Sequence, residues 1–261
     1  MTVHQSVTGG GVLELRLDDR ARRNALSAET IAELAGHLER LGGDDDLRVG
    51  ILTGTGDVFC SGGDTSRMGA QRPGPWARRD LLDAGVGRLA RLFVRLDKPV
   101  IAAVNGVAMG GGFEIALACD LIIASETASF ALPEPRVGLA ALAGGLHRLP
   151  RQIGAKRAMG MILTGRRVGA EEGRELGFVN EVTPPDELMA RAKHWAGMVL
   201  DCSPMSIRAS KQAVYGGLDI VGLKEAVETR FPAVIDMVKS EDFVEGPRAF
   251  AEKRKPDWKG R

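Results

Sequence analysis

Three consecutive glycines, Gly110, Gly111 and Gly112, constrain the fold of this chain more than any other feature. They lie between the apolar run 99–104 and the apolar run 115–119. The first run is bounded by turn formers and predicts a buried strand, whereas the second predicts a short buried helix. Glycine permits positive φ angles and lets another group approach the backbone closely. Because a helix start also leaves N–H groups unpaired, the sequence predicts a strand–loop–helix unit that can receive an anion or a developing negative charge.

A carboxylic acid, Glu114, follows these glycines within an apolar stretch. The glycines alone are equally consistent with a tight turn beside a solvated glutamate. A carboxyl group among apolar residues, however, needs a partner or a chemical role, because burying an unpaired charge is costly. Glu114 is therefore a candidate functional residue.

The unit of strand, glycine-containing loop and helix occurs a second time, upstream of the first. Residues 49–53 and 58–60 predict strands, the glycine-bearing loop 61–64 follows them, and apolar residues recur at helical spacing over residues 80–96. Such units stack strands into sheets with helices outside. The sequence therefore predicts an α/β fold.

A boundary is expected at Pro184-Pro185, after which the apolar periodicity is helical throughout. We expect an α/β core over residues 1–185 and a helical region over residues 186–261. The helices expected in that region are 186–200, 204–216, 220–238 and 246–254.

Composition disfavours several classes of function. The formal net charge of +1 provides no field that would favour nucleic acid or anionic lipid. No apolar run reaches the roughly 18 residues of a membrane span, and the first residues lack the pattern of a signal peptide. The three cysteines, Cys60, Cys119 and Cys202, have neither disulfide nor zinc spacing. We expect a cytoplasmic, reduced, metal-free protein whose thiols are buried and structural.

Two glycine loops and two carboxylic acids form the candidate constellation. Gly63 and Gly111 can each offer a backbone N–H, and a pair of such donors aimed at one oxygen is an oxyanion hole. Glu114 is followed by Glu134, and two neighbouring carboxyl groups can divide into an acid and a base. A Ser-His-Asp triad is not evident, because Ser61 lacks a nucleophile-elbow sequence and the four histidines are scattered.

A series of motifs along nearly the whole chain resembles the crotonase superfamily, the enoyl-CoA hydratases and isomerases. The matching segments are residues 24–26, 59–64, 98–106, 110–112, 130–134 and 163–165. Each motif is weak alone, but their order and spacing are specific. The resemblance implies a crotonase-like spiral of ββα units with a helical C-terminal trimerisation region.

The resemblance also implies an acyl-CoA thioester as substrate, which brings its own coenzyme A, so no further cofactor is expected. The thioester carbonyl would accept N–H bonds from Gly63 and Gly111. In hydratases of this family two glutamates hold and activate a water molecule, and Glu114 and Glu134 match them. Glu114 would act as base on the water that adds at C3, and Glu134 would deliver a proton to C2. Coenzyme A would enter near Arg23, Ala25, Ser61, Asp64 and Thr65.

The C-terminus resembles that of carnitinyl-CoA dehydratases in segments 164–172, 240–254 and 258–261. Phe250 and Lys253 match positions that, in the family, reach coenzyme A from the neighbouring subunit. A homotrimer or a dimer of trimers is therefore expected. Residues 139–146, which help to shape the acyl pocket, depart from the usual hydratase sequence, so the resemblance does not predict the acyl group.

Three functions stay open at this stage. The favoured one is a 2-enoyl-CoA hydratase, or the equivalent dehydratase, because both glutamates and both glycine donors are present. A 3,2-enoyl-CoA isomerase, with one carboxylate as proton shuttle, or a carnitinyl-CoA dehydratase-like enzyme would use the same site. A non-catalytic paralogue that binds acyl-CoA or RNA is the third, although RNA binding needs a basic surface that the net charge does not indicate. No nucleic-acid or membrane partner is expected.

Overall fold

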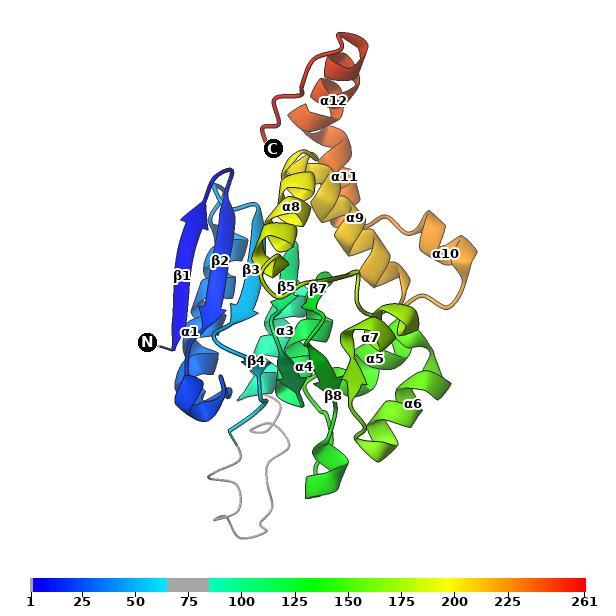
Figure 1. Cartoon of the computed structure of the whole chain (residues 1–261). Helices are drawn as coiled ribbons and strands as arrows, with labels where there is room; N and C mark the ends of the chain where they lie inside the picture. The colour runs from blue at the N-terminus through cyan, green and yellow to red at the C-terminus, as the bar shows by residue number, and fades with distance from the viewer. Residues whose placement is uncertain (1, 65–84) are drawn as a thin grey trace.

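Two β-sheets surrounded by helices make up the computed structural model, which describes residues 2–64 and 85–261 (Figure 1). The larger sheet has the strand order β1-β2-β3-β5-β7-β10, and in the described residues its one antiparallel pair is β1–β2. Its strands are Val3–Thr8 (β1), Val12–Leu17 (β2), Val49–Gly54 (β3), Val100–Val104 (β5), Leu121–Ser125 (β7) and Glu181–Thr183 (β10). The predicted α/β class is confirmed, although β1 was not predicted from the sequence.

A smaller sheet holds the glycine loops, with the strand order β4-β6-β8-β9. Its strands are Val58–Cys60 (β4), Val107–Met109 (β6), Ser129–Ala131 (β8) and Val168–Gly169 (β9). Strands β4, β6 and β8 follow β3, β5 and β7 of the larger sheet in the chain, and they pair parallel to one another. Their carboxyl ends therefore meet at one edge, where a glycine loop or Glu134 follows each of them.

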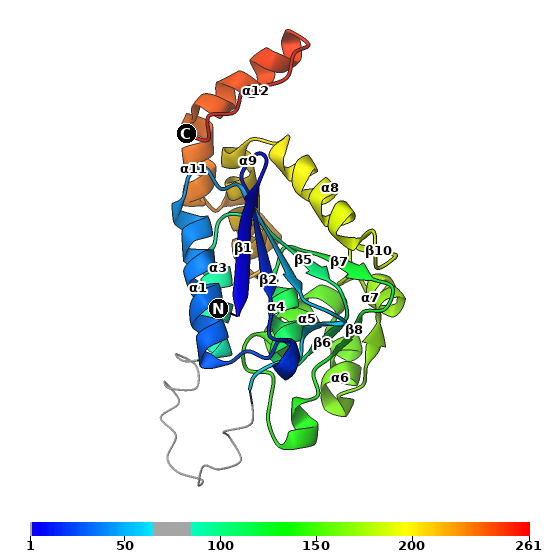
Figure 2. The ribbon, with the colours of Figure 1, turned by 60° about the vertical axis from the view of Figure 1, so that its left-hand side comes forward.

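Helices cover both sheets (Figures 1 and 2). In the core they are Ala28–Gly43 (α1), Val86–Arg95 (α3), Gly111–Ala118 (α4), Gly145–Ile153 (α5), Ala155–Thr164 (α6) and Ala170–Leu176 (α7). The predicted cap of α1 is confirmed, because the Ser27 hydroxyl accepts the Thr30 N–H at 3.1 Å. No helix among the described residues is long and apolar enough to cross a membrane.

A cluster of three phenylalanines fixes the elements that hold the two candidate glutamates. Phe113, Phe130 and Phe178 are buried, and each pair of ring centroids lies 5.2 Å apart. Phe113 directly precedes Glu114 on α4, and Phe130 lies on β8, just before Glu134. Because aromatic pairs in tilted and edge-on contact pack rigidly, α4 and β8 are held in a fixed relation.

The helical region after β10 contains Leu188–Leu200 (α8), Pro204–Gly217 (α9), Leu223–Glu228 (α10), Pro232–Lys239 (α11) and Glu241–Ala251 (α12). Helix α8 packs its buried residues against the larger sheet, and α12 projects away from the body of the molecule (Figure 2). Helix α9 is tied to the core by an ion pair of 2.7 Å between Lys211 and Asp120, and the Tyr215 hydroxyl donates to the same carboxylate at 3.1 Å.

The helix predicted over 115–119 is α4, which begins earlier, at Gly111, and two boundaries predicted in the helical region were also wrong. A single helix over 220–238 was expected, but α10 and α11 are separate, because Phe231 precedes Pro232 and adopts an extended backbone with ψ of 131°. The last helix was expected from residue 246, but it begins at Glu241, since the Ser240 hydroxyl accepts the Phe243 N–H at 3.2 Å.

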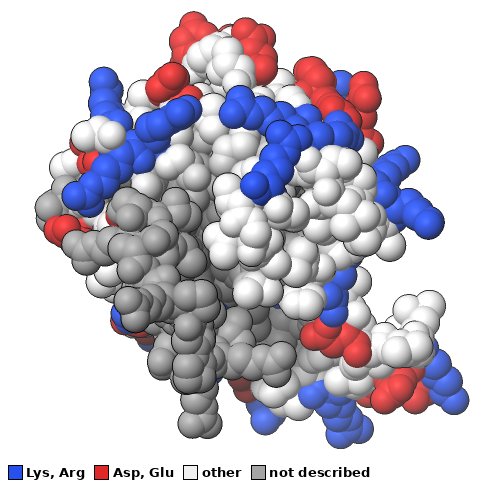
Figure 3. All heavy atoms as spheres, turned by 90° about the horizontal axis from the view of Figure 1, so that it is seen from below, with Lys and Arg blue, Asp and Glu red and all other residues white. Residues whose placement is uncertain are grey.

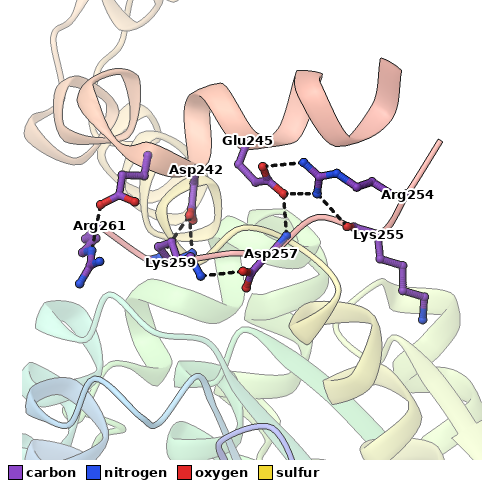
Figure 4. A network of polar contacts seen from close by, with 9 residues as sticks. Asp242, Glu245, Arg254, Lys255, Asp257, Lys259 and Arg261 are labelled. Carbon is purple, nitrogen blue, oxygen red and sulfur yellow. Dashed lines mark hydrogen bonds and ion pairs between the residues drawn. The ribbon is translucent and has the colours of Figure 1, made fainter. Parts of the chain in front are cut away.

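Polar contacts hold the C-terminal tail against α12 (Figure 4). The buried carboxylate of Asp242 accepts the Lys259 N–H at 2.7 Å and the Gly260 N–H at 3.1 Å, and it also accepts the Ser203 hydroxyl. Glu245 pairs with Arg254 at 2.5 Å. Asp242 therefore joins both the tail and the start of α9 to α12.

Candidate active site

The two glycine loops lie in contact at the carboxyl ends of β4 and β6. Gly62 has a φ of +101°, and a Cβ there would lie 2.8 Å from the Met109 carbonyl oxygen and 3.3 Å from the Gly111 nitrogen. Gly112 approaches the Cys60 carbonyl oxygen so closely that a Cβ would overlap it. Only glycine allows this approach, so the sequence places glycine where the two loops meet.

The N–H groups of Gly63 and Gly111 are both free of partners in residues 2–64 and 85–261. Gly111 is the first residue of α4, so its N–H has no partner within the helix. Gly63 forms an isolated parallel β-bridge with Leu26. The two hydrogen bonds of this bridge involve the Gly62 carbonyl oxygen and the Asp64 N–H, so the Gly63 N–H takes no part in them. A Cβ on Gly111 would lie 3.3 Å from Val86, and one on Gly63 4.0 Å from it. Both glycines therefore lie beside Val86, at the start of α3.

Glu114 is buried on α4, with 4 % of its surface exposed. Its Oε1 accepts the N–H of Gly145, the first residue of α5, at 2.9 Å. Burial raises the pKa of this carboxyl to about 7, and the nearby Glu134 acts in the same direction, while the Gly145 N–H and the Arg148 charge oppose them. Glu114 is thus poised to exchange a proton near neutral pH.

Glu134 begins the 3₁₀ turn Glu134–Val137 after β8. Its Oε1 lies 3.0 Å from the position that a Cβ on Gly110 would occupy, so the carboxyl group packs directly against the glycine loop. Its Oε2 is buried and has no hydrogen-bond partner in the described residues. Burial raises the pKa of this carboxyl as well. A buried carboxyl oxygen without a partner leaves room for a bond to a substrate or to water.

We expect Glu114→Gln to stabilise the protein at high pH. The native carboxyl has a pKa of about 7 against 4.5 in the unfolded chain. Between these values the native state binds more protons than the unfolded state, so the free energy of unfolding of the wild type falls as pH rises through this window. The amide does not ionise, and its oxygen can still accept the Gly145 N–H.

Urea unfolding at pH 5 and pH 8.5 measures the difference. From pH 5 to pH 8.5 the free energy of unfolding of the variant should rise by up to about 3 kcal/mol relative to that of the wild type, since one pKa unit corresponds to about 1.4 kcal/mol. A gap between wild type and variant that does not change with pH would contradict a raised pKa of Glu114.

The residues predicted to bind coenzyme A fall into two groups. Arg23, Ala25 and Ser61 lie together beside the glycine loops, because the Ser61 N–H donates to the Arg23 carbonyl at 3.1 Å and Leu26 binds the Gly62 carbonyl. Asp64 lies next to them, as its N–H donates to the Leu26 carbonyl at 3.3 Å. Thr65 lies outside the described residues.

Phe250 and Lys253 belong to the far end of the molecule. Phe250 lies in the last turn of α12 and Lys253 just after the helix, which projects away from the glycine loops (Figures 1 and 2), and Phe250 is 86 % exposed. The chain therefore does not bring these two residues to its own glutamates, and their predicted contact with a neighbouring subunit stays a prediction.

Two of the three thiols are buried, as expected, and one is not. Burial raises the pKa of Cys60 to about 12 and also raises that of Cys119, whereas Cys202 is exposed. A thiol with a raised pKa is a poor nucleophile.

In the described ranges no group of three or more His, Cys, Asp or Glu residues could hold a metal ion.

The sequence matches the family model for enoyl-CoA hydratase/isomerase over residues 8–261. The chain belongs to the enoyl-CoA hydratase/isomerase family. Among curated members, it is 42% identical to carnitinyl-CoA dehydratase from Escherichia coli K12, covering 97% of this chain and 96% of that protein. It is 41% identical to carnitinyl-CoA dehydratase from Proteus mirabilis HI4320, covering 97% of each. The predicted resemblance is confirmed.

Solved structures of family members share the fold over the full length. An enoyl-CoA hydratase from Bacillus anthracis superposes with a TM-score of 0.91 at 34% identity, with 100% of both chains covered. An enoyl-CoA hydratase from Mycobacterium tuberculosis H37Rv gives 0.88 at 32% identity, covering 100% of this chain and 99% of that one. The crotonase-like fold expected from the motifs is thereby confirmed for this family member.

Sequence reasoning missed the group that holds Glu114. The N–H of Gly145 comes from α5, a helix that was not predicted, because the preceding segment reads only as small and apolar residues. Gly144 has a φ of +113°, which ends the loop and starts the helix. The pair Gly144-Gly145 was the available signal, since two glycines before a periodic segment can mark a helix start.

Proposed function

We propose that this protein is a 2-enoyl-CoA hydratase, which adds water across the C2–C3 double bond of the thioester and catalyses the reverse dehydration. The observation that carries the proposal is the pair of carboxyl groups with raised pKa values beside two unpaired N–H groups. Family membership supports the substrate class, because the curated relatives and solved structures are described as enzymes acting on CoA thioesters.

The two N–H groups would bind the thioester carbonyl oxygen. When water adds at C3, negative charge develops on that oxygen as an enolate. Gly63 and Gly111 would stabilise this charge with donors that are already fixed in place by the loop contacts. The dipole of α4, whose first residue is Gly111, favours the same charge.

The two glutamates would move the protons. Glu114, as carboxylate, accepts a proton from the water molecule while the water oxygen bonds to C3. Glu134, as carboxylic acid, donates a proton to C2 as the enolate collapses. Opposite protonation states suit a close pair, because the charge of one carboxylate raises the pKa of the other. A pKa of about 7 for Glu114 lies close to a neutral operating pH, where general bases are most effective.

Coenzyme A would enter beside the arginines that precede the first loop. Arg20, Arg22 and Arg23 are exposed, and the carbonyls of Arg22 and Arg23 bind Ser61. Figure 3 shows Lys and Arg side chains around the face seen from below, with Asp and Glu side chains between them. Guanidinium groups bind phosphates well.

We also propose a homotrimer or a dimer of trimers. The support is a set of exposed apolar side chains in the helical region: Val221, Leu223, Val227 and Phe250.

The loss of absorbance of crotonyl-CoA and longer 2-enoyl-CoAs tests the proposal. Enzyme at nanomolar concentration should hydrate at least one of them to the 3-hydroxyacyl-CoA, identified by mass spectrometry. Absence of turnover across the series, with the folded state confirmed by circular dichroism, would refute it. Failure to bind any acyl-CoA in calorimetry would point to a non-catalytic role.

A further inference from the structure

A cavity of ≈ 530 Å³ lies between α3, α4, α5 and α9. This volume is within the range of small-molecule sites. Its walls include Gly87 and Ala90 of α3, Leu117 and Ala118 of α4, and Ala143 and Gly144 before α5. These residues are small or apolar, so this part of the wall suits a hydrocarbon chain, whereas the part formed by Arg148, Arg151 and Asp219 is charged.

The cavity adjoins the groups that would hold the reacting atoms. Gly87 follows Val86, which lies beside Gly63 and Gly111. Leu117 and Ala118 lie one helical turn beyond Glu114, and Gly144 precedes the Gly145 N–H that binds the Glu114 carboxyl. Three walls of the cavity therefore come from segments that also carry groups of the candidate active site.

One cation in this cavity lacks a carboxylate partner. The half-buried Arg148 guanidinium has one hydrogen bond to the described residues, of 3.3 Å, to the Ala90 carbonyl oxygen. Burial lowers the pKa of Arg148, yet a guanidinium remains charged at neutral pH. With one long bond for five N–H donors, it keeps donors for a further acceptor.

Two other polar side chains of this wall, Arg151 and Tyr215, already have an acidic partner. Arg151, on the same helix, pairs with Asp219 at 3.4 Å. The Tyr215 hydroxyl donates to Asp120 at 3.1 Å. Arg148 is thus distinguished from Arg151 by the absence of an acid within ion-pair distance among the described residues.

We propose that this cavity receives the acyl tail beyond the reacting carbons, and that Arg148 selects tails ending in a carboxylate. The inference rests on the proposed hydratase function and names its substrate class. A carboxylate can accept two parallel N–H bonds from a guanidinium. A methyl terminus leaves the donors unpaired, and a trimethylammonium terminus is repelled.

The test compares matched 2-enoyl-CoA substrates of increasing tail length. At each length the tail ends in a carboxylate, a methyl group or a trimethylammonium group, and kcat/KM is measured for the wild type. At the best length the carboxylate tail should exceed the methyl tail by about tenfold, as a charge-assisted hydrogen bond provides, and the trimethylammonium tail should be the poorest. A wild type that hydrates crotonyl-CoA but prefers the methyl or trimethylammonium tail would overturn this inference and leave the hydratase function intact. Failure on every substrate would instead refute the hydratase function.

Two variants separate Arg148 from the general charge of the cavity. For each variant, kcat/KM for the carboxylate tail is divided by kcat/KM for the methyl tail. A general loss of activity lowers both values equally and leaves this ratio unchanged. Arg148→Met should reduce the ratio about tenfold to near one, and Arg148→Lys should restore part of it. Arg151→Met, the matched control, should change it less than about twofold because Asp219 already neutralises that charge. An unchanged ratio in Arg148→Met, or an equal loss in Arg151→Met, would contradict the assignment.

Discussion

Glu134→Gln is expected to lower kcat for hydration of crotonyl-CoA by about 10²- to 10⁴-fold, the usual contribution of a general acid or base. The amide occupies nearly the same volume but cannot deliver a proton to C2. Oε2 of Glu134 has no hydrogen-bond partner in the described residues, so the substitution breaks no bond of that atom within them. The loss should therefore fall on turnover and leave the melting temperature within a few degrees of the wild type.

The matched control is Glu126→Gln, on the exposed turn between β7 and β8. It makes the same chemical change away from the glycine loops, so its kcat should stay within about twofold of the wild type, as expected of surface substitutions. Wild-type activity in Glu134→Gln would remove Glu134 from the proposed mechanism.

Gly112→Ala is expected to lower kcat/KM by at least about 10²-fold and to destabilise the fold by about 1–3 kcal/mol. The added Cβ would overlap the Cys60 carbonyl oxygen, which is backbone and cannot rotate away. The two loops must then separate, and the N–H groups of Gly63 and Gly111 no longer meet on one oxygen. The effect should appear in kinetics with crotonyl-CoA and in urea unfolding.

Gly160→Ala provides the comparison for a glycine without such contact. Gly160 lies within α6, and a Cβ there has nothing within 4 Å. Alanine is a better helix former, so this variant should be more stable by about 0.5–1 kcal/mol with unchanged activity. A Gly112→Ala variant that behaves like Gly160→Ala would show that the loops do not need their close contact.

Patterns of neighbouring residues in the sequence predicted those parts of the site that depend on a single segment of the chain. The triple glycine between two apolar runs predicted a strand, a glycine loop and a helix in this order, although α4 begins at Gly111, within the glycines, and strand β6 before them was not predicted. The apolar neighbours of Glu114 predicted a buried carboxyl group, and its exposure of 4 % confirms the burial, while its catalytic role stays a prediction. The break between α10 and α11 was also encoded locally, in Pro232, although the helical periodicity on both sides concealed it.

Long-range contacts were beyond sequence reasoning. The Gly145 N–H that binds Glu114 lies 31 residues away along the chain, and its position depends on how α5 packs against α4. The phenylalanine cluster likewise joins three separate segments. Arg148 carried no signal, because an arginine in an amphipathic helix is usually solvated; only the cavity distinguishes it.

The central claim is that two glutamates act together at one oxyanion hole, and one comparison tests it most directly. Steady-state kinetics of wild type, Glu114→Gln and Glu134→Gln should be measured with crotonyl-CoA and with a 3-enoyl-CoA. The two-glutamate account predicts that hydration of crotonyl-CoA falls by about 10²-fold or more in both variants. Full hydration activity in either variant, or 3-enoyl-CoA isomerisation as the main wild-type activity with one glutamate dispensable, would contradict it.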